Sequence, residues 1–245
     1  MSNYRHFLRR YTNLESLRCI LYKRRITLLD PQTWKDDSND SYYLSLYKKD
    51  KELKSLLALC LTKASERYHL WRTFCPGFEK EKRMDMKLKP FSDGYYDKDS
   101  ILTTIGVRIR FDRDELIMAI RDAGANSGSV MYQTLHQIEK LGQNQDDYLV
   151  KFPYYKRYGF RDEREYRIIY ESKSAENSTK DIPISLSCID KVILSPWLDH
   201  KLFTRVKDEI HSIHGCEKLK ISHSSLTDSK TWKKAGEDAI KTIRK

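Results

Sequence analysis

One stretch of this 245-residue sequence decides how the chain folds: Tyr155 to Tyr170, which reads YKRYGFRDEREYRIIY. From Arg164 onward polar and apolar residues alternate, and this pattern predicts a strand with two unlike faces. Alternation places Glu163, Glu165 and Arg167 on one face. The other face carries three apolar or aromatic side chains: Tyr166, Ile168 and Tyr170. A charged row and an apolar row therefore share one strand.

The two acids of this strand are the first candidates for catalysis. Like charges at neighbouring positions of one face repel each other, so a fold keeps them at a cost unless a cation, a ligand or a reaction uses them. We therefore expect the active site at Glu163 and Glu165. The alternative is a half-exposed strand on which Glu165 and Arg167 only offset each other's charge.

The composition indicates a folded chain outside the membrane. Hydrophobic residues make up 39% of the sequence and aromatic residues 11%, which is too rich for a disordered chain. No apolar run approaches the roughly 20 residues of a membrane span, and the N-terminal MSNYRHFLRR lacks the apolar segment of a signal peptide. The five cysteines are scattered and form no CxxC pair. We expect a cytoplasmic protein without disulfides or membrane contact.

The charge indicates a polyanionic partner. The net charge is +11, and the chain carries 16 tyrosines. Cations displace counterions from phosphates and aromatic rings stack on bases, so this mixture favours nucleic acid. A charge that only keeps the protein soluble explains the composition equally well.

The periodicity predicts one α+β domain over residues 1–245. Strands are expected at 4–11, 25–29, 105–112, 164–170, 189–195 and 218–221, and helices at 51–57, 114–121, 130–141 and 198–213. The aromatic run 68–74 is either a core-facing helix or the wall of a stacking pocket. A first helix of about ten residues follows the capping-box spacing that begins at Thr12. The run 57–62 is either a buried helix end or a central strand, and 123–129 is a flexible break. Residues of about 75–100 form a long insertion, and about 229–245 a basic terminal helix.

A metal site is not expected. His211, His214, Cys216 and His223 lie close in sequence, but no second compact ligand pair completes a tetrahedral site.

Four segments, taken in order, resemble a bacterial family of unknown function and the related abortive-infection proteins. The first is Arg10-Tyr11 with the helix that follows it, and the second is LLDPQTWKDD at 28–37. The third joins Thr62 to HLWRTF at 69–74 and GVRIRFD at 106–112. The last is the EREYR segment, followed by IDKVILS at 189–195. Phe74 stands where the family has Tyr, so it receives no catalytic role.

This layout also resembles ADP-ribosyltransferases, with a late Glu-x-Glu motif. The resemblance implies NAD as the cofactor, bound by four residues: Arg10, Tyr11, Thr62 and Trp71. It implies that Glu165 stabilises the positive charge that develops on the ribose and that Glu163 activates the acceptor. Ahead of this pair, Tyr155, Lys156 and Arg157 are placed to bind the acceptor.

The sequence thus predicts an NAD-dependent ADP-ribosyltransferase, the toxin of a bacterial phage-defence or toxin–antitoxin system, with RNA as the expected acceptor and an antitoxin protein as partner. One alternative is a metal-dependent nuclease that uses four carboxylates: Asp36, Asp40, Glu163 and Glu165. Another is a non-catalytic nucleic-acid-binding module of a defence system.

Overall fold

The structure, a computed structural model, describes residues 6–34, 40–75, 104–141 and 149–243. Helices and strands are mixed along the chain, which confirms the predicted α+β class. The chain forms two compact units. Unit 1 contains residues 1–10, 19–65 and 110–190, and unit 2 contains 11–18, 66–109 and 191–245. Four elements run from one unit into the other: β1 (Phe7–Asn13), α1 (Leu14–Lys23), β4 (Gly106–Asp112) and β10 (Ile189–Leu194).

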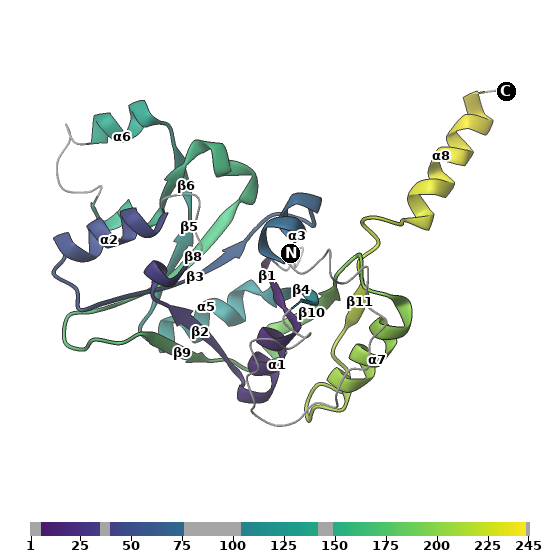
Figure 1. Cartoon of the computed structure of the whole chain (residues 1–245), viewed down its shortest axis with the longest axis horizontal. Coiled ribbons are helices and arrows are strands. Elements are labelled where there is room, and N and C mark those ends of the chain that lie inside the picture. Colours follow the sequence, from purple (N-terminus) through teal and green to yellow (C-terminus); the bar gives the residue numbers. More distant parts are fainter. Residues whose placement is uncertain (1–5, 35–39, 76–103, 142–148, 244–245) are drawn as a thin grey trace, which may run out of the picture. The chain divides into compact units, whose positions relative to one another are not determined.

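Strand β3 (Ser55–Thr62) is the centre of unit 1 because its SLLALCLT sequence is apolar enough to be covered on both faces. It pairs antiparallel with β8 (Glu165–Ser172), from Ser55 opposite Ser172 to Thr62 opposite Glu165. Its other edge pairs with β1 at Arg9 and with β2 (Arg25–Leu29) at Leu29. Strand β9 (Thr179–Pro183) extends the sheet beyond β2, and β5 (Asn126–Ser129) pairs with β8 (Figure 1).

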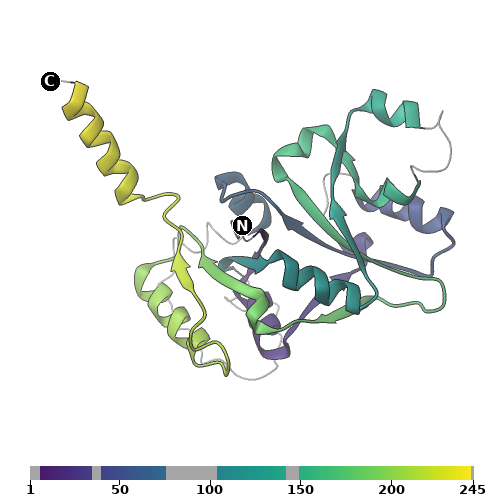
Figure 2. The ribbon, with the colours of Figure 1, turned by 180° about the vertical axis from the view of Figure 1, so that it is seen from behind.

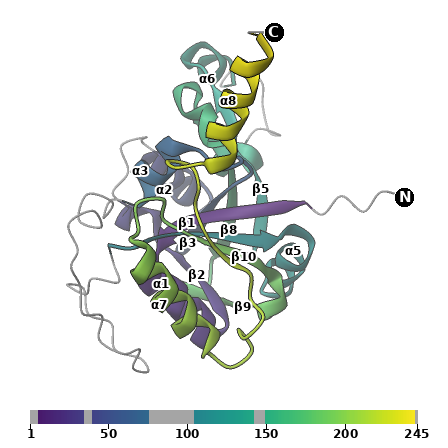
Figure 3. The ribbon, with the colours of Figure 1, turned by 90° about the vertical axis from the view of Figure 1, so that its right-hand side faces the viewer.

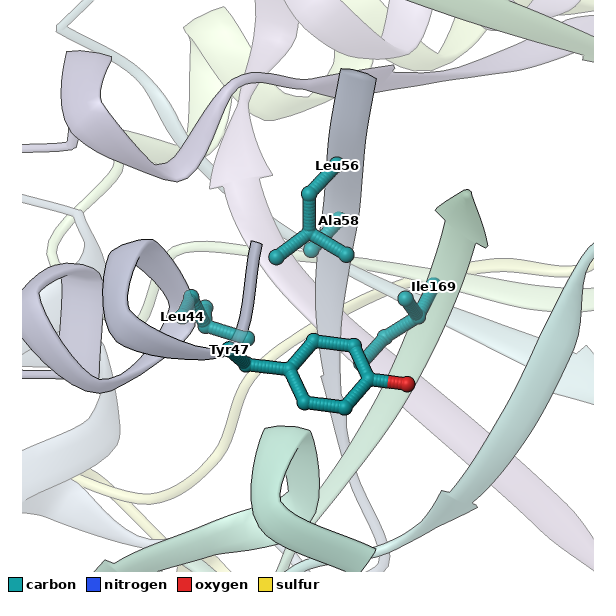
Figure 4. Close-up of a cluster of buried hydrophobic side chains, with 5 residues drawn as sticks. All are labelled: Leu44, Tyr47, Leu56, Ala58 and Ile169. Carbon is teal, nitrogen blue, oxygen red and sulfur yellow. The ribbon is translucent and has the colours of Figure 1, made fainter. Parts of the chain in front are cut away.

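Helix α2 (Asp40–Asp50) covers one face of this sheet. Its buried residues Asp40, Leu44 and Tyr47 recur at helical spacing, so they form a single stripe. Leu44 and Tyr47 pack on Leu56, Ala58 and Ile169 of β3 and β8, as Figure 4 shows. The Tyr47 hydroxyl donates a 3.0 Å hydrogen bond to Glu171 at the far end of β8. The register of β3 and β8 places Arg167 and Glu165 on this same face, next to Asp40.

Helix α5 (Arg113–Asp122) covers the opposite face and comes to the front in Figure 2. Asp112 caps it by accepting hydrogen bonds from the backbone N–H groups of Asp114 and Glu115. Leu116 and Ile120, one turn apart, are its buried residues.

A second layer of short elements covers the edge where β8 begins. Strands β6 (Met131–Gln133) and β7 (Tyr155–Arg157) pair in parallel, and α6 (Leu135–Leu141) follows β6. Thr134 and Gln137 form a capping box at the start of α6. Two 3-10 helices flank β7: η3 (Leu149–Tyr154) and η4 (Tyr158–Glu163).

In unit 2, β10 pairs in parallel with β11 (Ile221–His223). Helix α7 (His200–His211), labelled in Figure 3, connects the two strands. Asp199 caps α7, whose buried stripe is Leu202, Val206 and Ile210. The remaining helices are α3 (Tyr68–Phe74) and α8 (Lys230–Ile243). Within the described ranges, no helix is long and apolar enough to span a membrane.

The structure corrects three predictions of local structure. The helix expected at 51–57 is wrong, because α2 ends at Asp50 and β3 begins at Ser55. The break expected at 123–129 contains β5, whose pairing with β8 the short polar sequence NSGS does not reveal. The helix expected at 130–141 is strand β6 followed by the shorter α6. The insertion expected at 75–100 lies almost entirely outside the described residues.

The α2 stripe predicts which leucine of this helix stabilises the fold. Leu44 is 1% exposed and Leu46, two residues later, is 41% exposed. Leu44→Ala should lower the free energy of unfolding by about 2–5 kcal/mol, because it leaves a cavity against β3 and β8. Leu46→Ala on the solvent side is the matched control and should change it by less than about 1 kcal/mol. Urea denaturation of both variants tests this; equal losses would contradict the packing.

Candidate active site

The acidic pair lies at a sharp turn into β8. Glu163 ends η4, Arg164 takes a left-handed conformation (φ 47°), and Glu165 begins the strand. Thr62 of β3 fixes this turn: its hydroxyl donates to the Glu163 carbonyl and accepts from the Ala64 N–H. The two acids are therefore not successive members of one strand face, as the alternation predicted. They meet because the turn directs both carboxylates to the same cation.

That cation is Lys156, in the middle of β7. Its Nζ lies 2.7 Å from Glu163 Oε2, 3.0 Å from Glu165 Oε2 and 3.1 Å from Asp40 Oδ2. Two of the three carboxylates come from the consecutive elements η4 and β8, and the third comes from α2, which is distant in sequence. Lys156 Nζ also lies 5.2 Å from the centre of the Phe160 ring, a cation–π contact.

Arg167 completes this group, which we call the ionic cluster: Asp40, Lys156, Glu163, Glu165 and Arg167. The Arg167 side chain is 1% exposed. Its Nε donates to Glu165 at 2.7 Å, one terminal nitrogen to Asp40 at 2.7 Å and the other to the Pro153 carbonyl at 2.7 Å. Three carboxylates face two cations, so the cluster carries one excess negative charge when all its acids are ionised.

The cluster shifts its acids in opposite directions. Burial acts to raise the pKa of Glu165, but Arg167 and Lys156 outweigh it and lower that pKa to about 2. For Glu163, burial prevails over the attraction of Lys156 and raises the pKa. Burial likewise raises the pKa of Asp40 despite Arg167 and Lys156. Burial would lower the pKa of Lys156, yet its three carboxylate neighbours raise it, so the ammonium stays charged.

These contacts bear on the metal-dependent alternative. Asp40, Glu163 and Glu165 do converge, as that hypothesis requires, whereas Asp36 lies outside the described residues. The point of convergence holds the Lys156 ammonium, which donates hydrogen bonds to Glu163 Oε2 and Glu165 Oε2. Across the described ranges, no group of three His, Cys, Asp or Glu side chains is arranged to hold a metal ion.

Arg10 is a half-buried cation near this cluster, and its Nε atom is buried. Burial lowers its pKa to about 10, and Cys60 is the neighbour that opposes this shift. Cys60 in turn interacts with Glu165 and Arg167, and burial raises the pKa of its thiol. Arg10 Nε has no hydrogen-bond partner, and within the part of the chain that the structure describes no carboxylate forms an ion pair with Arg10.

Two of the predicted NAD-binding residues, Tyr11 and Trp71, belong to unit 2. Their rings pack edge to face with centres 5.0 Å apart, and Trp71 is completely buried. The Trp71 indole N–H donates to Glu66 at 2.9 Å, and burial raises the pKa of Tyr11 to about 12. Both side chains therefore contribute to the core of unit 2. Thr62, the remaining predicted contact of NAD, has its hydroxyl engaged in the turn that ends at Glu165.

The three predicted acceptor contacts have different surroundings. Tyr155 is 2% exposed and packs against Phe152, with ring centres 5.9 Å apart. Lys156 is the centre of the ionic cluster. Arg157 is the one of the three whose side chain is exposed.

The sequence predicted Lys156 as a contact of the acceptor and did not identify it as the centre of the site. It suggested Asp40 only as a metal ligand and did not identify it as the third acid. A local signal for Asp40 exists, because Asp40, Leu44 and Tyr47 have the spacing of one buried helix face. Nothing in the sequence indicates that this face meets β8.

A cavity of about 560 Å³ opens beside the cluster. Asp40 and Lys156 form part of its wall. The rest of the wall comes from α2, the β6–α6 segment and β7: Tyr42, Tyr43, Gln133, Thr134, Leu135, Ile138 and Arg157. Cavities of about 300–1,000 Å³ are typical of small-molecule sites.

No family model and no curated protein matches this sequence. The chain is similar to solved structures of DarT from Thermus sp. 2.9. The DarT complex with ADP-ribosylated ssDNA has a TM-score of 0.40 and 11% identity, over 89% of this chain and 94% of that chain. The complex with NAD+ has a TM-score of 0.41 and 10% identity, over 91% and 98%. The complex with carba-NAD+ has a TM-score of 0.40 and 9% identity, over 91% and 97%. At these values the chemistry must be argued from the residues of the chain itself.

The low pKa of Glu165 predicts how stability depends on acid. Its folded pKa of about 2 lies below the ordinary glutamate value of about 4.3, so its ionisation stabilises the fold above that value. This contribution should disappear as the pH falls from about 4.3 toward 2. The pKa values of Asp40 and Glu163 are raised, so the changes in stability that come from their ionisation occur above this pH window.

Denaturant unfolding of the wild type at a series of pH values should therefore show a steep loss of stability in this window. Glu165→Gln should remove that slope, whereas the exposed Glu176→Gln, the matched control, should keep it. Parallel curves for the wild type and Glu165→Gln would contradict the charge state assigned to Glu165.

Proposed function

We propose that the chain is an NAD-dependent ADP-ribosyltransferase that acts as the toxin of a bacterial phage-defence or toxin–antitoxin system and modifies nucleic acid, with RNA as the expected acceptor. The observation that carries this proposal is the opposite shift of two acids that share one lysine: Glu165 is held ionised and Glu163 has a raised pKa. Where two neighbouring acids have pKa values shifted in opposite directions, the acid that stays ionised can stabilise positive charge and the other can transfer a proton.

The ionic cluster suits the charge that this reaction develops. NAD supplies the ADP-ribosyl group, and positive charge builds on its ribose as the bond to nicotinamide breaks. A buried, ionised Glu165 stabilises that charge without reorganisation, because Arg167 and Lys156 already fix its position. The excess negative charge of the cluster adds to this effect. Nicotinamide departs as a neutral molecule, so the charge that the residues stabilise is confined to the sugar.

Glu163 suits the second half of the reaction. Its side chain is 15% exposed, compared with 4% for Glu165, so it is the more accessible of the two acids. A carboxylate with a raised pKa is the better proton acceptor. As a nucleophilic oxygen or nitrogen of the acceptor bonds to the ribose carbon, its proton passes to Glu163.

Arg10 suits the anionic part of NAD. A half-buried guanidinium without an acidic partner among the described residues carries a desolvation cost that an anion would offset, and the pyrophosphate of NAD is such an anion. Cys60 lies between Arg10 and Glu165 in this network of interactions, so the phosphate and the ribose would bind near one another. Thr62 then acts indirectly, because it holds the turn that positions Glu163.

One set of parallel incubations tests this proposal against the two alternatives. Purified protein with NAD labelled on its adenylate moiety should release nicotinamide and transfer label to RNA without added metal. Parallel reactions contain RNA, single-stranded DNA or total protein, each with and without EDTA. Nucleic-acid cleavage that EDTA abolishes, without nicotinamide release, would establish the nuclease instead. Neither cleavage nor nicotinamide release would favour the non-catalytic module. Label on protein alone would correct the acceptor.

The Glu-x-Glu motif predicts which acid of β8 matters. Glu165→Gln keeps the shape but removes the charge, so nicotinamide release should fall by about 10²-fold or more. Glu171→Gln, six residues along the same strand, is the matched control and should keep full activity, since Glu171 lies outside the ionic cluster and accepts a hydrogen bond from Tyr47 of α2. Because Glu165 is buried among charges, the more exposed Glu163→Gln provides a second variant that should also lose transfer. Well-folded, fully active forms of both variants would eliminate the catalytic assignment.

A further inference from the structure

The cavity beside the ionic cluster has a wall that the proposed reaction at Glu163 and Glu165 does not use. Of its lining residues, only Asp40 and Lys156 belong to the cluster. Tyr42 and Tyr43 contribute aromatic rings from α2, Gln133 an amide from β6 and Arg157 a guanidinium from β7. These are the side chains that bind a base and its phosphate.

The aromatic side of the cavity is a row of packed rings that ends in the exposed Tyr42. Tyr43 stacks on Phe152 with ring centres 5.1 Å apart and an interplanar angle of 24°, and Phe152 packs on the buried Tyr155. Tyr42 lies at the outer end of this row, 6.4 Å from Tyr43, and is 61% exposed. An exposed ring supported by a stacked row is a suitable platform for a flat, apolar face such as a nucleobase.

The polar side of the cavity offers unpaired groups. Gln133 and Arg157 are direct neighbours on the parallel strands β6 and β7. Within the described ranges, no hydrogen bond or ion pair engages the Gln133 amide or the Arg157 guanidinium. An amide can both donate to and accept from a base edge, and an exposed guanidinium binds phosphate. Thr134, by contrast, uses its hydroxyl in the capping box of α6.

We infer that this cavity binds one unpaired nucleotide of a single-stranded nucleic acid and presents it to the ionic cluster as the acceptor. The base stacks on Tyr42, Gln133 reads its edge and Arg157 holds a flanking phosphate. Lys156 connects the two sites, because it lines the cavity and lies within 3.0 Å of both Glu163 and Glu165. The role as acceptor site rests on the proposed transferase activity, whereas binding of the nucleotide does not.

This arrangement replaces the acceptor contacts that the sequence predicted. Tyr155 supports the stacked row from within the core, and Tyr42 takes over the contact with the base. Lys156 forms ion pairs with Glu163 and Glu165 and so does not bind a phosphate of the acceptor. Arg157 keeps its predicted role, so one of the original three residues remains in contact with nucleic acid.

The test measures binding without NAD, so that it does not depend on catalysis. Fluorescence anisotropy is recorded with labelled RNA and DNA single strands of about 12 nucleotides, within the site sizes of known single-strand binders. Tyr42→Ala should weaken binding about tenfold through lost stacking, and Tyr42→Phe should retain it. Arg157→Ala should reduce the dependence of log K on log salt by about 0.7, the effect of one phosphate contact. Gln133→Ala should reduce the preference among homopolymers.

The matched controls are Tyr22→Ala and Arg121→Ala, exposed residues of unit 1 on α1 and α5, which should bind as the wild type does. If the Tyr42, Gln133 and Arg157 variants bind like these controls, the cavity is not the nucleotide site. Displacement of the strand by NAD through the same three residues would also overturn the inference, since it would assign the cavity to the cofactor.

The two proposals fail in distinguishable ways. Binding that depends on Tyr42, Gln133 and Arg157, without any nicotinamide release, would retain the nucleotide site and overturn the transferase. Nicotinamide release, together with nucleic-acid binding that the three substitutions do not weaken, would retain the transferase and overturn the site. RNA and DNA strands of the same sequence, compared on the wild type, identify which sugar the site prefers.

Discussion

A buried guanidinium that must find acceptors on every side is the constraint on which unit 1 depends. Arg167 is 1% exposed, and its three donors reach a carboxylate of its own strand, a carboxylate of α2 and a backbone carbonyl of η3. Leaving any of these donors unpaired in the interior would cost about 1–3 kcal/mol or more, because the group carries a charge. Strand, helix and loop are therefore held in one arrangement by a single side chain.

The packing of α2 continues this constraint along the helix. Asp40 meets Arg167, one turn later Leu44 packs on β3, and Tyr47 reaches Glu171. An apolar contact thus lies between two polar ones on a single helical stripe. A helix that slid by one turn would separate Asp40 from Arg167 and place Leu44 against charges. The polar ends set the register, and the apolar centre supplies most of the stabilisation through burial.

The same contacts create the chemistry that we assign to the site. Lys156 and Arg167 hold three carboxylates together that would otherwise repel, and they do so unequally. Glu165 receives both cations and becomes a permanent anion, while Glu163 receives Lys156 alone and keeps a raised pKa. Asp40 also contacts both cations, yet burial raises its pKa, so the balance between burial and ion pairing at each acid separates a group that stabilises charge from a group that can accept a proton.

The sequence by itself determined the α+β class and most of the strands and helices, because periodicity and caps act within a few residues of the chain. It also placed Glu163 and Glu165 close to each other. It predicted the wrong means, a shared strand face, because the left-handed turn at Arg164 and the Thr62 contact that fixes it arise from pairing with β3. Only the tertiary structure brought Asp40 and Lys156 to this pair of acids. Asp40 lies 116 residues before Lys156, and Lys156 lies 7 residues before Glu163. Electrostatic energy depends on distance in space, and the sequence does not contain that distance until the chain has folded.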